Sequence, residues 1–132
     1  MPSRVWSHVC NYATQGRGGM VSIIEEFDTI GFPSMPAHYP FFQVASKWEG
    51  SEDESFVYGV RVTTPHRAVL YEVPGQAVTI RKHVAFAQPA SFLVSGFAGA
   101  LFPEFGEYAV ELLIDNLPVH ILPLYILQIH TA

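Results

Sequence analysis

Charged residues are scarce in this chain. Only 14% of its 132 residues are Asp, Glu, Lys or Arg, and 49% are hydrophobic, whereas roughly a quarter of an average soluble domain is charged. Seven residues are Lys or Arg, and the net charge is −5. Nucleic-acid binders carry a basic stripe, and anionic membrane surfaces attract clustered Lys and Arg. We therefore expect neither nucleic acid nor membrane as a partner, and apolar surface left over for a protein.

Cysteine is nearly absent, and so is any long apolar run. Cys10 stands alone, which rules out a disulfide within the chain and favours a reducing compartment. The N-terminal residues MPSRVWSHVCNYAT lack the continuous apolar region of a signal peptide. The longest apolar run, Leu117 to Ile129, is too short to span a bilayer and is interrupted by His120, Pro123 and Gln128. We expect a soluble, cytoplasmic protein.

Helical periodicity is also missing. No window repeats its apolar residues every three to four positions, and there is no internal repeat, linker or low-complexity tail. The length is that of one ordinary domain, so we expect a single domain over residues 1–132.

Two-residue alternation is what the sequence has instead, and it is clearest in the stretch FGEYAVELLID, Phe105 to Asp115. Successive side chains of a strand point to opposite sides of a sheet, so this pattern predicts a half-buried strand. Leu113 is the one large apolar residue out of phase. The predicted inward face consists of Tyr108, Val110, Leu112 and Ile114.

Two hairpins are predicted from neighbouring segments of this kind. Phe41 to Trp48 and Phe56 to Thr63 alternate on either side of a polar turn. Val5 to Thr14 and Met20 to Ile30 flank the glycine-rich residues Gln15 to Gly19, whose GRGG spacing matches no phosphate-binding motif.

The remaining segments are shorter or less regular. Pro74-Gly75 predicts a type II turn between two short strands. Ser91 to Phe97 predicts a strand, with a helical turn over Phe97 to Leu101 as the alternative. Pro123 places the last strand, Val119 to Gln128, at a sheet edge or a bend. The whole pattern predicts seven to nine strands in an all-β, antiparallel two-sheet sandwich of immunoglobulin-like or C2-like type.

The order of these segments resembles a known family. A glycine-rich hairpin leads into SIIEEFDTIGFPSMP, then a strand ending in WEG, then FGEYAVELLIDN and a last strand with PLYIL. This is similar to a family of small, mostly bacterial proteins of unknown function with a β-sandwich fold. The resemblance covers nearly the whole chain and implies no activity, cofactor or catalytic residue. The chain departs from the pattern at Glu25-Glu26, where a small or apolar residue is usual.

Catalytic and metal-binding motifs are not found. The six histidines are scattered without the H-x-H or H-x-x-x-H spacing of metal sites, and Cys10 has no cationic neighbour or nucleophile elbow. The run Glu52 to Glu54 would suit a solubilising turn better than calcium, whose ligands come from several loops. We assign no catalytic, cofactor-binding or metal-binding residue.

Three functions remain open. The first is a non-enzymatic interaction or self-association module, because the last strand, Val119 to Ile129, is apolar on both faces and one face would be left for a second subunit or a partner chain. The second is a small-ligand binder with a pocket under the irregular, proline-rich loop Gly31 to Pro40. The third is a metal-dependent enzyme, which would need two of His38, His66, His83 and His120 to meet a carboxylate. The candidate ligand or partner contacts are His38, Tyr39, His120, Leu122 and Leu113.

Overall fold

Nine strands and no α-helix make up the described part of the chain, residues 1–16, 19–82 and 87–130 of a computed structural model. In chain order the strands are β1 (Ser3–Gln15), β2 (Val21–Glu26), β3 (Thr29–Phe32), β4 (Ala37–Glu49), β5 (Ser55–Thr63), β6 (Val69–Thr79), β7 (Ala90–Phe102), β8 (Gly106–Ile114) and β9 (Leu117–Gln128).

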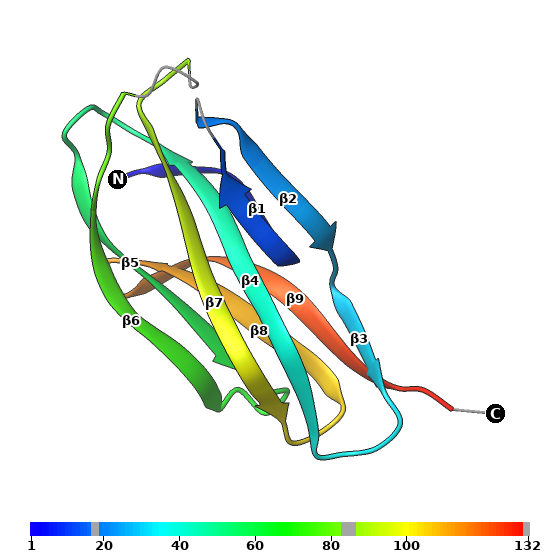
Figure 1. Cartoon of the computed structure of the whole chain (residues 1–132). Helices are drawn as coiled ribbons and strands as arrows, with labels where there is room; N and C mark the ends of the chain where they lie inside the picture. The colour runs from blue at the N-terminus through cyan, green and yellow to red at the C-terminus, as the bar shows by residue number, and fades with distance from the viewer. Residues whose placement is uncertain (17–18, 83–86, 131–132) are drawn as a thin grey trace.

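The strands form two sheets that lie face to face (Figure 1). The four-stranded sheet has the order β2-β1-β4-β7, and the five-stranded sheet has the order β3-β9-β8-β5-β6. The prediction of an all-β, two-sheet fold is confirmed. All pairs are antiparallel except β3 with β9, which run parallel because β3 follows a crossing from the other sheet.

The core lies between the sheets and follows the predicted alternation. On β8, Tyr108, Val110, Leu112 and Ile114 are fully buried, as predicted. They lie beside the buried alternate residues of β5 in the same sheet and face the inward residues of β4 in the other sheet, which are buried as well. The core members on these two strands are Phe42, Val44, Trp48, Phe56, Tyr58, Val60 and Val62. When one face of a sheet packs against another sheet, every second side chain of each strand is buried, which explains this spacing.

One predicted hairpin is confirmed and the other is wrong. β1 pairs antiparallel with β2, although residues 17 and 18 of the glycine-rich connection lie outside the described residues. β4 and β5, in contrast, belong to different sheets: β4 pairs with β1 and β7, and β5 pairs with β6 and β8. Each strand buries one face in the core that the two sheets share. Alternation alone does not show whether two such strands pair within one sheet or pack against each other from different sheets.

The predicted turn at Pro74-Gly75 is also wrong, because β6 runs through it. The register with β5 shifts by one residue between the pairs Tyr58–Gln76 and Val60–Val73, so the two residues sit in a β-bulge. Gly75 does not adopt a positive φ. An edge strand tolerates proline at a bulge because no neighbour needs its missing N–H.

The loop predicted over Gly31 to Pro40 is much shorter in the structure. β3 reaches Phe32 and β4 begins at Ala37, so only residues 33–36 connect them. Both strand ends gain partners from distant segments, β3 from β9 and the start of β4 from the end of β7. The strand predicted at Ser91 to Phe97 is confirmed and extends to Phe102, which makes the alternative helical turn wrong. The segment Met20 to Ile30 is split, since β2 and β3 lie in different sheets.

Candidate interaction surface

His38 and Tyr39 lie on β4, on opposite sides of the strand, rather than on a loop over a pocket. Tyr39 packs against the core, its ring 5.6 Å from that of Phe27 and 6.2 Å from that of Phe42. Its hydroxyl donates a hydrogen bond of 2.6 Å to Oδ1 of Asn11. His38 is exposed, with Nδ1 3.4 Å from the carbonyl oxygen of Gly99. The packing explains Tyr39 without a ligand, and a ligand-binding role for these two residues stays a prediction.

His120 and Leu122 lie on the inward side of β9, in the other sheet. His120 is paired with the buried Leu112, and Leu122 packs against the core. Burial lowers the pKa of the His120 imidazole, and the nearby Arg4 charge lowers it further. Both effects favour the neutral ring near pH 7. The structure does not bring these residues together with His38 and Tyr39.

Leu113 lies on the outward side of β8 but is only 5% exposed. Its side chain covers Gly59 of β5, whose added Cβ would lie 3.6 Å from Leu113 Cδ1. A partner would therefore reach little of Leu113, and its role as a contact stays a prediction.

The outward side of β9 and the residues at its two ends carry the most extended exposed apolar strip on the five-stranded sheet. Five aliphatic residues there are 40–60% exposed. We call this set the β9 outer face: Leu117, Val119, Ile121, Leu127 and Ile129. The sequence predicts the segment but not these residues, because a strand that is apolar on both faces does not show which alternate positions face outward.

The neighbouring strand limits this strip with charge. Ile121 is paired with Glu111 of β8, and Glu111 accepts a 2.8 Å hydrogen bond from Nε of Arg61 on β5. Glu107, also on β8, is exposed. An apolar strip with a polar border is the anatomy of many protein interfaces.

β9 is open on one side along its first half. β3 pairs only with Tyr125 to Gln128, so the part from Leu117 to Pro123 has β8 as its one hydrogen-bonded neighbour. Pro123 lies at the end of this open part, which agrees with an edge position there. The β9 outer face is thus accessible from both the sheet surface and its edge.

Histidines and carboxylates meet only in pairs within the described ranges. Nδ1 of His8 is 2.6 Å from a Glu26 carboxylate oxygen, and Nε2 of His66 is 3.2 Å from Glu104. No group of three or more His, Cys, Asp or Glu suited to a metal ion occurs among the residues that the structure describes. His83 lies outside them.

Cys10 and the acidic turn each have a structural explanation. The thiol is fully buried, with Sγ 3.7 Å from the Gln43 carbonyl oxygen, and burial raises its pKa, with a smaller contribution from Glu26. A thiol with a raised pKa is a poor nucleophile near neutral pH. In the turn after β4, Asp53 pairs with Arg81.

The two best-formed hollows on the described part of the surface have no lining residue from 31–40. One, of about 280 Å³, lies between β6 and β7 and is lined by Tyr71, Glu72, Val73, Pro74, Gly96, Phe97, Ala98 and Ala100. The other, of about 250 Å³, is lined by Glu26, Phe27 and Asp28. A ligand pocket under residues 31–40 stays a prediction. In the described ranges, no helix has the length and apolar character needed to cross a membrane.

The family model described as a family of unknown function, DUF6941, matches residues 5–127. The chain belongs to this family. The resemblance noted in the sequence is thereby confirmed as far as a family of unknown function is concerned. No curated protein matches the chain. The DUF6941 region runs from β1 into β9, so it includes both sheets and every candidate contact residue named above except Ile129. The DUF6941 description assigns no activity, and no catalytic role can be carried over from it.

Proposed function

We propose that this protein is a non-enzymatic interaction module that contacts a second protein chain through the β9 outer face. The simplest occupant is a second copy of the chain. The observation that supports this is the exposure of five aliphatic side chains on or beside one strand whose other side lies in the core. Fully burying an exposed Leu or Ile side chain is worth about 1.5–3 kcal/mol, so residues already half exposed offer a clear gain.

The surrounding groups suit a protein partner better than a membrane or a nucleic acid. The border of the strip contains the Arg61–Glu111 pair and the exposed Glu107, and the whole chain has a net charge of −5. Acidic groups repel phosphate backbones and anionic headgroups. They can remain hydrated at the rim of a protein interface.

The same proposal assigns the fold to the immunoglobulin-like rather than the C2-like type, and treats residues 1–132 as one domain. The order β9-β8-β5-β6 matches that of strands G, F, C and C′ in immunoglobulin variable-type sheets. Tyr108, near the start of β8, donates a 2.7 Å hydrogen bond to the carbonyl oxygen of Glu104, four residues upstream. This is the arrangement of a tyrosine corner. Immunoglobulin-like domains use their strand faces and loops to bind other proteins.

A cytoplasmic location belongs to the proposal as well. Immunoglobulin domains of antibodies join their sheets with a disulfide, whereas the single, buried Cys10 forms none. The interior here is filled by Trp48, whose ring lies 6.0 Å from that of Tyr58. A sandwich stabilised by packing alone is suited to a reducing compartment.

A charge on the strip tests the proposal. Ile121→Lys places an ammonium group in the centre of the β9 outer face, and we expect it to weaken self-association at least tenfold. Ile24→Lys is the matched control, because Ile24 is 46% exposed against 55% for Ile121 but lies on β2 in the other sheet. Sedimentation velocity from micromolar to millimolar concentration measures both. Equal behaviour of the two variants, or a monomeric wild type throughout, would contradict the proposal.

A further inference from the structure

β7 is an edge strand without the protection that edge strands usually have. It is the last strand of the four-stranded sheet, and β4 is the one strand of the described chain that forms a ladder with it (Figure 1). Its 13 residues, ASFLVSGFAGALF, include no charged residue and no proline. Natural sheets protect their edges with charges, prolines, bulges or very short strands, because a free edge can pair with another chain. β7 is long, neutral and open.

The other three edge strands show that this protein uses such protection elsewhere. β2 ends in Glu25 and Glu26, and Glu25 has a φ of 56°. β6 carries Glu72 and the bulge at Pro74. β3 is only four residues long. Among these four edge strands, β7 is therefore the one that is long and has neither a charged residue nor a proline.

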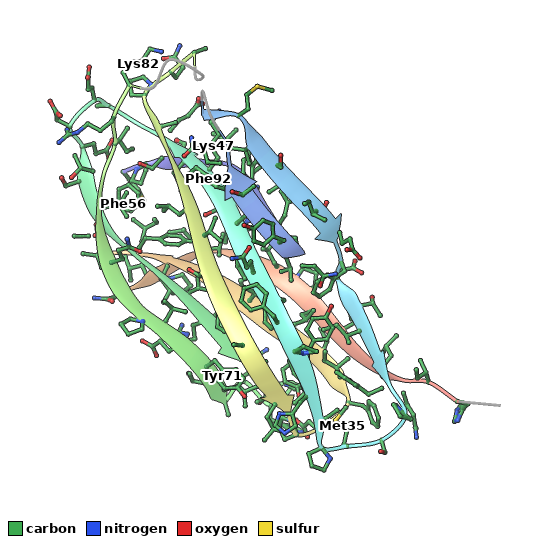
Figure 2. The ribbon with its side chains drawn as sticks, in the orientation of Figure 1. Met35, Lys47, Phe56, Tyr71, Lys82 and Phe92 are labelled. Carbon is green, nitrogen blue, oxygen red and sulfur yellow. The ribbon has the colours of Figure 1, made fainter. Side chains whose placement is uncertain are left out.

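Contacts to β6 and to Arg81, which follows β6, occupy the two ends of β7 and leave its middle free. Tyr71 lies near the start of β6 (Figure 2). Its hydroxyl accepts a 2.6 Å hydrogen bond from the amide of Leu101 and lies 3.2 Å from the carbonyl oxygen of Leu101. At the other end, an isolated bridge joins Arg81 to Ala90. Between these ties lies the hollow of about 280 Å³, whose lining includes Gly96 and Phe97 of β7 and Glu72 of β6. The accessible edge is the middle of β7, centred on Gly96.

The sequence of this free part is complementary to itself. If two copies of β7 run antiparallel about a two-fold axis at Gly96, each large side chain meets a small one. Ser95 is then opposite Phe97, and Val94 is opposite Ala98. The regular pairing ends before Gly99, whose φ is +62°. Directly opposite side chains on one face of a sheet touch, so alternating sizes let the two copies interlock without clashes. The axis itself passes between two glycines.

We propose that β7 joins two copies of this chain, edge to edge, through antiparallel pairing about Gly96. The two four-stranded sheets then form one continuous sheet of eight strands. A second copy is the occupant that fits, because its β7 supplies the complementary side-chain sizes and has no charged residue of its own. The rest of each copy repels the other, since the net charge is −5. Added salt screens that repulsion and leaves the seam unaffected, so association strengthens as ionic strength rises.

Disulfide trapping tests the register directly. Across an antiparallel ladder, directly opposite Cα atoms are about 4.5–5.5 Å apart, within the range that a disulfide spans. Gly96→Cys therefore forms a covalent dimer under mild oxidation. Ala98→Cys is the matched control: its two thiols are displaced along the strands by four residues, about 14 Å. The native Cys10 is fully buried and gives no background. Equal trapping of the two variants, or none with folded Gly96→Cys, would overturn the proposal.

A charge exchange at the same position separates a lost interface from a lost fold. Gly96 has no positive φ, and a Cβ there would lie 3.3 Å from the ring of Phe41, which is 40% exposed and can move. Gly96→Lys and Gly96→Glu alone place like charges opposite each other and abolish pairing at β7. An equal mixture restores it, because unlike charges then meet across the axis. Failure of the mixture to pair, while each variant is folded by circular dichroism, would overturn the proposal.

Both experiments are run in an Ile121→Lys background, where the β9 outer face is blocked. This inference does not depend on the function proposed for that face. Trapping at Gly96 that persists in this background supports β7 pairing whether or not β9 binds a partner. Trapping that disappears with Ile121→Lys would show that β9 alone brings the copies together, and would overturn the inference.

Discussion

Single polar side chains inside the core show how the sandwich tolerates hydroxyl groups. Ser46 is fully buried on β4, where its hydroxyl accepts a 2.8 Å hydrogen bond from Nε1 of Trp48. The same hydroxyl lies 3.0 Å from that of Tyr58 on the opposite sheet. No buried side-chain nitrogen or oxygen among the described residues lacks a partner. The inward position of Ser46 was predictable from alternation, but its partner across the core was not.

Removing the Ser46 hydroxyl should lower the free energy of unfolding by more than the loss of one small group would suggest. Ser46→Ala leaves the Trp48 N–H without its acceptor and the Tyr58 hydroxyl without its partner, and leaving a buried polar group unpaired costs about 1–3 kcal/mol. We expect the free energy of unfolding to fall by roughly 2 kcal/mol in urea denaturation. The control is Ser22→Ala on the exposed edge strand β2, which should change it by less than about 0.5 kcal/mol. A neutral Ser46→Ala variant would show that the network contributes nothing.

Tyr58 makes stability depend on alkaline pH. Burial raises the pKa of its phenol to about 12, an effect that the hydrogen bond with Ser46 offsets only in part. In the unfolded chain a tyrosine titrates near pH 10. The folded state therefore keeps a proton that the unfolded state loses, and stability falls as pH rises from about 10 to about 12. Below pH 10 this contribution is fully present.

Tyr58→Phe should reduce that dependence. Two pKa units correspond to on the order of 2 kcal/mol, so the loss of unfolding free energy between pH 9 and pH 12 should be smaller by about that amount in the variant. Urea denaturation at both pH values measures it. Tyr12, which is 49% exposed, provides the control Tyr12→Phe, expected to match the wild type. An unchanged pH dependence in Tyr58→Phe would contradict the raised pKa.

At the scale of strands, the sequence predicts which residues face the core better than it predicts which strands are neighbours. The inward faces of β4, β5 and β8 follow from a period of two, which is a local property. Pairing is not local: β4 pairs with β1 at positions such as Cys10 and Gln43, 33 residues apart, and with β7 at positions such as Glu49 and Ala90, 41 residues apart. The turn predicted at Pro74-Gly75 was wrong for the same reason: the pairing of β6 with β5, which is not local, makes these residues a bulge on an edge strand.

The candidate site depended on the same distinction. Sequence analysis found the apolar last strand but chose His120 and Leu122, which face inward, and not Ile121, which faces out. When a strand is apolar on both faces, the sequence does not show which alternate residues face the core and which face solvent. Only the register with β8, where Leu112 pairs with His120, assigns the faces.

The corner between β7 and β8 depends on Gly106. Its φ is +143°, and an added Cβ would lie 2.6 Å from Cγ of Pro65 in the loop after β5. We expect Gly106→Ala to lower the free energy of unfolding by roughly 1–3 kcal/mol, the usual cost of one strained backbone position. Gly59→Ala is the matched control, because a Cβ there meets its nearest atom at an ordinary 3.5 Å. Thermal or urea unfolding of both variants checks the difference. Equal stability of the two would contradict the account of this corner.

At the scale of the whole molecule, two surfaces of different kinds stand out. The β9 outer face is an apolar sheet surface, and the middle of β7 is a neutral sheet edge. They lie on different sheets, so a copy bound at one leaves the other accessible. The Gly96 variants block one surface and Ile121→Lys blocks the other, which allows each to be measured alone.

The most direct measurement of the central claim maps the contact residue by residue. Amide spectra of the Gly96→Lys variant, in which the β7 edge is blocked, are recorded by NMR from micromolar to millimolar concentration. The account predicts concentration-dependent shifts confined to Leu117 to Ile129 and the adjoining residues of β8, abolished by adding Ile121→Lys. Spectra that do not change over this range, or shifts that lie on the other sheet, would contradict it.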